Sequence, residues 1–354
     1  MTKVSRGNFF EDFHLGQALH HATPRTVGDG ERALYIALTG ARHLTHCNEP
    51  VAKALGYRAM PIDDLLAFHI AFGKTVPDIS VNAVANLGYA DVRFMAPVYA
   101  SDTLSTSSTV IGLKQNSNGK SGVVYVRSVS SNQHGQDVLS WARWVMVHKS
   151  NVDAAMPAAV VPELPAMVSV DNLRIPDFLD GNKWNTAITG STNLWNDYQV
   201  GERIDHPAGM TVDDSDHTLA TKLYQNNAHL HFDRHMMKDS AFGQRLMYGG
   251  HVISICRALS YEGLENVISI AAINAGVHCN PSFGGDTFYA WTEVLEKWEI
   301  PGRADIGALR LRMVGLKNLP ADALPQTHIQ QVGKQVYHPN VVLDMDYTVF
   351  MPRR

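Results

Sequence analysis

The segment Phe10-Glu-Asp-Phe-His-Leu-Gly-Gln17 returns 185 residues later as Trp195-Asn-Asp-Tyr-Gln-Val-Gly-Glu202. The same offset pairs His46 with His231 without a gap. Other landmarks keep this order with shifts of at most two residues, and they include His21 with His206, Arg58 with Arg245, and Pro97 with Pro281. Landmarks kept in order over such a length indicate a tandem duplication of one structural unit.

Each copy shows the same predicted order of elements. In the first copy, Glu31–Leu38 has helical apolar spacing, and Asp64–Val76 is apolar almost all round, so the second helix should be buried. Three extended runs follow in each copy, and they are Asp102–Gln115, Val123–Ser131 and Val138–His148 in the first and Asp286–Ile300, Ile306–Leu316 and Val341–Phe350 in the second. A curved antiparallel sheet wrapped around a buried helix satisfies both patterns.

We therefore predict an α+β protein made of two tandem copies of this unit. The first copy occupies residues 1–150 and the second residues 191–354, with residues 151–190 as linker and crossover. The linker is assigned because Asn151–Ala166 is rich in Ala, Val and Pro and has no periodicity.

Composition excludes several classes of protein. The 354 residues are 45% hydrophobic and 18% charged, with a net charge of −4 and no Lys/Arg-rich run, so nucleic acid is not an expected partner. No apolar run is long enough to cross a membrane, and the amino terminus lacks a signal-peptide core. Cys47, Cys256 and Cys279 show no Cys-x-x-Cys spacing, which favours buried free thiols in a reducing compartment. We expect a cytoplasmic protein without a membrane partner.

The repeated pattern resembles the MaoC-like, or (R)-specific enoyl-CoA hydratase, superfamily in its double-hotdog form. Four segments further resemble the mesaconyl-CoA hydratase (β-methylmalyl-CoA dehydratase) family, and they are Ala22–Val27, Pro61–Leu66, Phe72–Ser80 and Tyr248–Cys256. The resemblance covers nearly the whole chain. It implies two hotdog folds, a short branched acyl-CoA substrate, and reversible hydration of its double bond. It also implies that no cofactor is needed, because CoA is part of the substrate; we expect a homo-oligomer.

Members of the superfamily carry Gly-Asp-x-Asn-Pro-(Leu or Ile)-His after the first helix, where the Asp and His handle water. Aligned with this motif, the second copy has Asn226 at the acid position and retains His231, whereas the first copy has Ala41 and retains His46. An amide can orient a water but cannot accept a proton at neutral pH. The resemblance thus makes His231 the candidate acid/base and Asn226 its orienting partner, in a second copy that bears the site.

The superfamily also expects a glycine where the buried helix begins. Gly249 and Gly250 fit this position in the second copy, whereas the first copy has Ile62 and Asp63. A glycine there lets substrate approach the backbone, and the unpaired N–H groups of the helix can hold a thioester oxygen as it gains negative charge.

Asp63 and Asp64 open the buried helix of the first copy, where carboxylates suit the cap and the helix dipole. If both buried helices begin near a shared cleft, one of these carboxylates could supply the acid that Asn226 lacks. A dicarboxylic substrate would also need a cation for its free carboxylate. The candidates include Arg25 and Arg93, for which a place at the surface or at a sheet edge is an equal alternative.

Two other classes of protein remain open from the sequence. His229, His231, Asp233 and His235 alternate, so on a strand they could ligate a metal in a cupin-like enzyme, although the Glu usual after His-x-His is missing. Hotdog folds also host thioesterases and non-catalytic acyl-CoA binding proteins, because a fold does not fix its chemistry.

Overall fold

A computed structural model describes the whole chain except residues 1–2, 156–157 and 325. The first copy contains η1 (Phe10–Asp12), β1 (Ala18–His20), β2 (Arg25–Thr26), α1 (Asp29–Thr39), α2 (Leu44–Cys47), α3 (Glu49–Ala54), α4 (Asp64–Ile79), β3 (Ala83–Phe94), β4 (Thr103–Gln115), β5 (Ser121–Ser131) and β6 (Asp137–His148), where η is a 3-10 helix. The segment between the copies contains η2 (Val170–Asn172), η3 (Gly181–Lys183) and α5 (Thr186–Thr189).

The second copy repeats this order. It contains η4 (Trp195–Asp197), β7 (Arg203–Asp205), β8 (Met210–Thr211), α6 (Asp214–Leu223), η5 (His229–His231), α7 (Arg234–Met237), α8 (Gly249–Leu259), β9 (Ser269–His278), β10 (Thr287–Ile300), β11 (Arg303–Lys317), η6 (Ala321–Ala323), β12 (His328–Gln331), β13 (Lys334–Tyr337) and β14 (Val341–Pro352). The starts of α6 and α8 follow those of α1 and α4 by 185 residues, so the structure repeats at the offset seen in the sequence. None of the described helices is long and apolar enough to cross a membrane.

Buried histidines show the same equivalence in detail. Nε2 of His21 lies 2.8 Å from the Ser108 hydroxyl on β4, and Nε2 of His206 lies 2.8 Å from the Thr292 hydroxyl on β10. Each imidazole thus ties the start of its copy to the corresponding strand. The two copies are therefore related in side-chain contacts as well as in the order of their elements.

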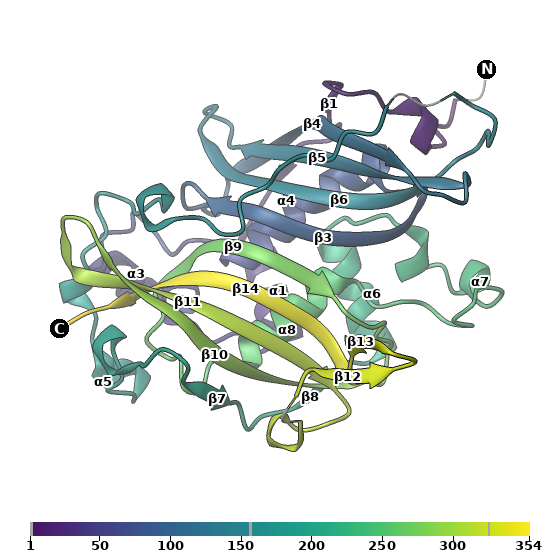
Figure 1. The fold of residues 1–354 in the computed structure, drawn as a ribbon. Coiled ribbons are helices and arrows are strands. Elements are labelled where there is room, and N and C mark those ends of the chain that lie inside the picture. The colour runs from purple at the N-terminus through teal and green to yellow at the C-terminus, as the bar shows by residue number, and fades with distance from the viewer. Residues whose placement is uncertain (1–2, 156–157, 325) are drawn as a thin grey trace.

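A single twelve-stranded sheet runs through both copies (Figure 1). Its main order is β1-β4-β5-β6-β3-β9-β14-β11-β10-β7, with β2 beside β4 and β8 beside β10. The copies join where β3 and β9 pair antiparallel, with Ala90 opposite Ala275. The fold is the predicted α+β double hotdog.

The sequence analysis missed β3 and β9, because it predicted three strands in each copy. Both strands have interrupted pairing: the register of β3 shifts three times against β6, and that of β9 shifts twice against β14. Both also contain an unbroken run of five buried residues at the centre of the sheet. The even alternation that reveals a half-buried strand is therefore weak in them.

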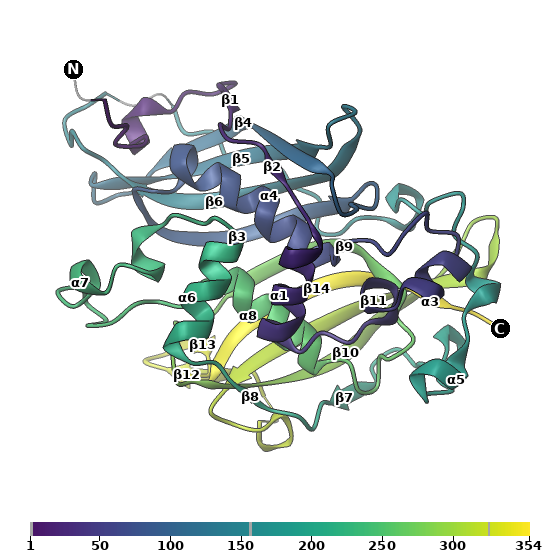
Figure 2. The ribbon, with the colours of Figure 1, turned by 180° about the vertical axis from the view of Figure 1, so that it is seen from behind.

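The long helices α4 and α8 lie against the sheet on its helical side (Figure 2). Nearly every residue of each helix is buried, as the sequence predicted for Asp64–Val76. Polar contacts link the copies inside this core: the Ser254 hydroxyl of α8 accepts a hydrogen bond from the Tyr35 hydroxyl at 3.0 Å and lies 2.9 Å from Nε2 of His69 on α4. The two helices belong to one continuous core.

The expected linker, residues 151–190, contacts both copies. Val160 exchanges two backbone hydrogen bonds of 2.8 Å with Leu113 of β4, and the Val168 N–H donates to the Asn274 side chain of β9 at 2.9 Å. Residues 156–157 of this segment lie outside the described residues. The boundaries at 150 and 190 stay predictions.

Gly73 lets α4 of the first copy approach the loop after α6 of the second copy. A Cβ atom on Gly73 would lie 2.1 Å from the Tyr224 carbonyl oxygen and 3.3 Å from the Asn226 nitrogen. Because any side chain at this position would displace the backbone next to Asn226, the absence of a side chain at Gly73 fixes where that loop lies.

We predict that Gly73→Ala lowers the free energy of unfolding by about 1–3 kcal/mol, the usual cost of overpacking. An ordinary Gly→Ala change inside a helix instead gains up to about 1 kcal/mol. Gly30→Ala in α1 is the matched control, since no atom lies within 4 Å of the added Cβ. Urea unfolding of both variants checks the sign, and a stabilised Gly73→Ala would contradict the close approach.

Candidate active site

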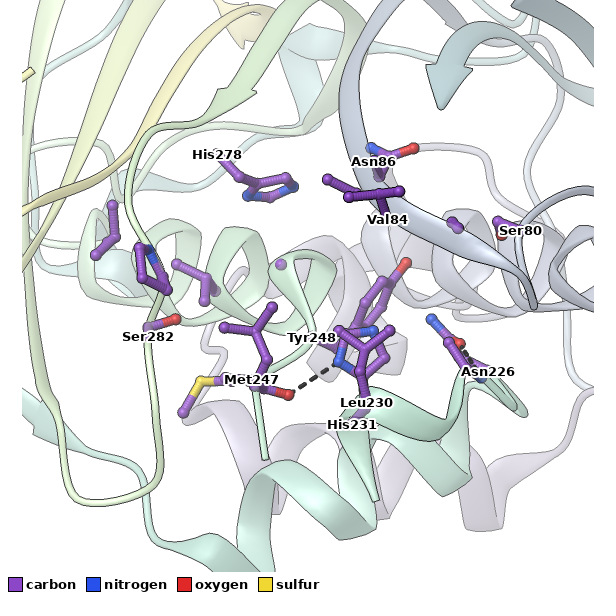
Figure 3. Close-up of a pocket in the computed structure, with 18 of the residues that line it drawn as sticks. Ser80, Val84, Asn86, Asn226, Leu230, His231, Met247, Tyr248, His278 and Ser282 are labelled. Carbon is purple, nitrogen blue, oxygen red and sulfur yellow. Dashed lines mark hydrogen bonds between the residues drawn. The ribbon is translucent and has the colours of Figure 1, made fainter. Parts of the chain in front are cut away.

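A cavity of about 280 Å³ lies between the two copies. The second copy contributes residues from the loop around η5, from the start of α8 and from the end of β9, and the first copy contributes α4 and the start of β3. Figure 3 shows His278 facing His231 across this space, with Tyr248 beside His231 and with Val84 and Asn86 on the side of β3. The cavity holds the second-copy motif, but both copies build its walls.

His231 is held in one orientation at the end of η5. Its Nδ1 lies 2.9 Å from the Leu246 carbonyl oxygen, so Nδ1 carries the proton and donates it to that carbonyl. Burial lowers the pKa of His231 to about 4, although the bond to the carbonyl opposes the shift. The imidazole is therefore neutral near pH 7, and Nε2, which has no hydrogen-bond partner among the described residues, is left as a proton acceptor.

Asn226 lies at the turn before η5 and also lines the cavity. Its Oδ1 accepts a hydrogen bond from the Ala228 N–H at 3.0 Å, so its Nδ2 group is the one left to donate to a ligand. Gln225, just before it, has a φ of 51° and bonds to the Lys74 ammonium of α4. The first copy thus supports the backbone that carries Asn226.

The start of α8 is open to the cavity. Tyr248 is the residue before its first turn and makes no capping hydrogen bond, so the first N–H groups of the helix are available. Gly249 lines the cavity, whereas Gly250 does not. A Cβ on Gly249 would lie 2.5 Å from the His278 ring, and one on Gly250 would lie 2.4 Å from the Tyr248 ring. Glycine therefore allows a ring to pack closely at both positions, that of His278 at Gly249 and that of Tyr248 at Gly250.

The corresponding place in the first copy is filled by its own side chains. Asp63 caps α4, since its carboxylate accepts from the Leu65 N–H at 2.9 Å and from the Leu66 N–H at 3.3 Å. Asp64 accepts from the Ile270 N–H at 2.8 Å and lies 3.3 Å from Nε2 of His46. Only about 10 Å³ remains there.

Asp63 and Asp64 therefore lie away from His231, and the expectation of a shared cleft is wrong. The reason is the antiparallel pairing of β3 with β9, which places the starts of these strands, and the cavity beside each, at opposite ends of the pair. The larger cavity has no Asp or Glu among its described lining residues.

The two equivalent histidines have opposite electrostatic surroundings. Burial by itself lowers the pKa of His46, but the attraction and hydrogen bond of Asp64, with a contribution from Asp63, raise that pKa above its usual value. His231 has no such carboxylate, and its pKa falls. His46 is thus part of an ion pair, whereas His231 is a neutral base.

His278 and Tyr89 line the cavity and were not identified from the sequence. The Tyr89 hydroxyl lies 3.2 Å from Nε2 of His278, and burial, with a smaller effect of His231, lowers the pKa of His278 to about 4. No motif marks His278, because it ends β9, a strand the sequence analysis missed. Its spacing from His231 carries no local signal.

Neither arginine proposed for a substrate carboxylate lines the cavity. Arg25 donates to the Leu223 carbonyl and pairs with Glu31 at 2.9 Å, and Arg93 pairs with Asp91 at 2.7 Å. Both charges are used within the protein. These two candidates are therefore wrong as cavity residues.

The strand needed for a metal site at His229, His231, Asp233 and His235 is not formed. Residues His229–His231 form a 3-10 helix, and Asp233 caps α7 by accepting from the Met236 N–H at 2.9 Å. Across the part of the chain that the structure describes, no group of three His, Cys, Asp or Glu side chains could hold a metal ion. The alternation in the sequence reflects two short helical turns.

We predict that stability falls as the pH drops from 6.5 toward 4. Burial lowers the pKa to about 4 for His206, His231 and His278 and to about 3 for His69 and His251. The unfolded chain therefore binds more protons than the native one in this window. Each imidazole lowers the free energy of unfolding by up to about 1.4 kcal/mol for each pH unit of acidification. Urea unfolding should show that the free energy of unfolding is at least about 2 kcal/mol lower at pH 5 than at pH 7.

The control for this prediction is His206→Gln, which removes one buried imidazole outside the cavity. Its stability should depend less steeply on pH than that of the parent chain. Equal stability of the parent chain at pH 7 and pH 5 would show that these histidines are not held neutral.

Comparison with known proteins identifies the family of the chain. A sequence model of the family described as mesaconyl-CoA hydratase matches residues 2–321. A β-methylmalyl-CoA dehydratase from Chloroflexus aurantiacus is 55% identical over 353 residues, covering 100% of this chain and 99% of its own length. A mesaconyl-CoA hydratase from Cereibacter sphaeroides is 52% identical over 353 residues, covering 99% of this chain and all of its own.

Solved structures agree as well. A putative MaoC domain protein dehydratase from Chloroflexus aurantiacus superposes with a TM-score of 0.96 at 54% identity, covering 100% of both chains. A Mycobacterium tuberculosis protein described as a double hotdog fold has a TM-score of 0.77 at 22% identity, covering 98% of both chains, which supports the fold alone. The chain belongs to the mesaconyl-CoA hydratase family.

Proposed function

We propose that this protein catalyses the reversible addition of water to mesaconyl-CoA, which gives β-methylmalyl-CoA. The observation that carries the proposal is the cavity in which the free Nε2 of a neutral His231 and the uncapped start of α8 face the same space. Hydration needs a base for water and a dipole for the thioester oxygen, and these two features supply them. The names of the 55% and 52% identical relatives point to the same substrate pair.

His231 transfers the proton in this mechanism. Its Nε2 takes a proton from water as the water oxygen bonds to the β-carbon, and the same nitrogen then delivers the proton to the α-carbon. Both proton transfers are assigned to this one base, since no carboxylate lines the described cavity. Nε2 of His278 is not assigned this role, since it is bonded to the Tyr89 hydroxyl.

The start of α8 stabilises the charge that develops on the thioester oxygen. The Gly249 N–H is in the first turn, where the helix dipole is positive, and this residue lines the cavity. Gly250 contributes a second N–H of this turn and keeps Tyr248 in place. In the first copy, Asp63 accepts from the N–H of Leu65, the equivalent of Gly250, and from that of Leu66.

Asn226 orients the water in this proposal. Since its Oδ1 is bonded to Ala228, its Nδ2 donates a hydrogen bond to the water oxygen and leaves a water proton directed at His231. An amide in this place holds the nucleophile without taking a proton. Asn226 thus positions the water, and His231 transfers the proton.

Thioester hydrolysis and non-catalytic binding are the alternatives, and one assay separates them from hydration. We predict that mesaconyl-CoA loses its enoyl-thioester absorbance without release of free thiol, and that it reacts faster than crotonyl-CoA in competition. Thiol release would identify a thioesterase, and binding without a change in absorbance would identify a binding protein. Equal rates for the two substrates would retain hydration and remove the assignment to mesaconyl-CoA.

We predict opposite effects of the two equivalent histidine substitutions. His231→Ala should lower turnover about 100-fold or more, the usual cost of losing a general base. His46→Ala should leave turnover nearly unchanged but lower the urea midpoint, because Asp64 loses its buried partner. Steady-state kinetics and urea unfolding of both variants check this, and a similar loss of turnover in each would mean that both copies take part.

Three other expectations stay predictions. They are activity without a cofactor, a cytoplasmic location and a homo-oligomeric assembly. The three cysteines are free in the structure, but only Cys256 is buried, so the expectation of buried thiols is wrong for Cys47, which is exposed, and for Cys279, which is partly exposed.

A further inference from the structure

Arg143 lies at the centre of β6, where it is paired with Tyr89 of β3 and with Val126 of β5. Its side chain is directed from the sheet toward the C-terminal part of α4, and the residue is only 1% exposed. It also lines the cavity that contains His231. No sequence motif marks it.

The hydrogen bonds of Arg143 leave part of its guanidinium unused. Nη2 donates to the Thr75 hydroxyl at 2.9 Å and to the Ser80 hydroxyl at 3.4 Å, and the guanidinium carbon lies 4.2 Å from the centre of the Phe72 ring. Nε and Nη1 are buried and have no hydrogen-bond partner among the residues that the structure describes. Two donors of a fully buried cation are thus unsatisfied.

Arg143 also lacks a counter-ion. Within the described chain it forms no ion pair, and no Asp or Glu lines the cavity. Other partly buried arginines on the sheet do have carboxylate partners, as Arg310 has Asp346 at 2.6 Å and Arg312 has Asp344 at 2.7 Å. Burial lowers the pKa of Arg143 only to about 10, so it stays charged at neutral pH.

The second, small cavity differs from the larger one in the charges that line it. Arg257 of α8 is buried there in the place that Phe72 occupies on α4, and Asp63 and Asp64 line the same space. The protein supplies the negative charge in that cavity. In the larger cavity a buried cation has no anion from the protein, and an unpaired buried charge is costly.

We propose that Arg143 binds the free carboxylate of the acyl group and so selects dicarboxylic acyl-CoA substrates. The inference rests on the proposed function for the identity of that acyl group. Because Nη2 is already bonded to Thr75 and Ser80, the Nε–H and the N–H groups of Nη1 are the donors left for a carboxylate.

The position of Arg143 relative to His231 suits this substrate. In mesaconyl-CoA the carboxylate is attached to the carbon that receives the water, so its binding group must lie near the base. Tyr248 connects the two: its ring centre is 5.5 Å from that of His231 and 6.1 Å from that of Phe72, over which Arg143 lies. Arg143 and His231 line the same cavity, and Phe72 and Tyr248 form the apolar wall between them that faces the methyl branch.

The first experiment compares Arg143→Gln and Arg143→Lys with the parent chain on mesaconyl-CoA and crotonyl-CoA. Arg143→Gln should lower kcat/KM for mesaconyl-CoA about 100-fold or more, because a buried charge pair is lost, and should leave crotonyl-CoA nearly unaffected. Arg143→Lys should recover part of the loss. Arg93→Gln is the control, since Arg93 is outside the cavity and Asp91 keeps Arg127 as a partner. Equal losses on both substrates would overturn the proposal.

The second experiment needs no catalysis and no variant. Calorimetry should show that the parent chain binds succinyl-CoA at least about 10-fold more tightly than butyryl-CoA, which has the same chain length but no carboxylate. Equal affinities would overturn the assignment even if every Arg143 variant failed to fold. If the preference is present but mesaconyl-CoA is not hydrated, the proposed function fails and the carboxylate site stands. If mesaconyl-CoA is hydrated without this preference, the proposed function stands and the carboxylate site is overturned.

Discussion

The antiparallel pairing of β3 with β9, with Ala90 opposite Ala275, is the contact on which the rest of the structure depends. It joins two hotdog sheets into one and places α4 and α8 in a common core. It also brings the start of β3 from one copy next to the motif loop of the other. Neither copy alone could enclose the cavity, because its walls come from both.

After the duplication, the same backbone positions in the two copies differ chiefly in charge. One copy places carboxylates at the start of its buried helix, and they cap the helix, pair with His46 and fill the space. The other copy has Tyr248 and Gly249 there, so the helix start stays open. One site is thereby satisfied by its own groups, and the other keeps unsatisfied donors and a neutral base that a ligand can use.

The open cavity keeps polar groups at a cost to folding. His231 is held neutral by burial, and Arg143 is buried without a counter-ion. Such groups are expected where function opposes stability, since a bound substrate supplies the missing partners. The supporting contacts come from the first copy, as shown by the approach of Gly73 to the loop at Asn226 and by the bond from Lys74 to Gln225.

The sequence by itself determined the duplication, the α+β double hotdog, the buried helix at Asp64–Val76 and the second-copy motif that contains Asn226, His231 and Gly249. The duplication and the buried helix follow from order along the chain and from local periodicity, whereas the double hotdog and the motif follow from the resemblance to the superfamily. Tertiary structure alone decided that Asp63 and Asp64 lie away from His231, that Arg25 and Arg93 have partners elsewhere, and that His278, Tyr89 and Arg143 line the cavity. The physical reason is that these placements depend on β3 and β9, whose shifted register hides their pattern, and on an antiparallel pairing that sends equivalent residues to opposite ends of the sheet.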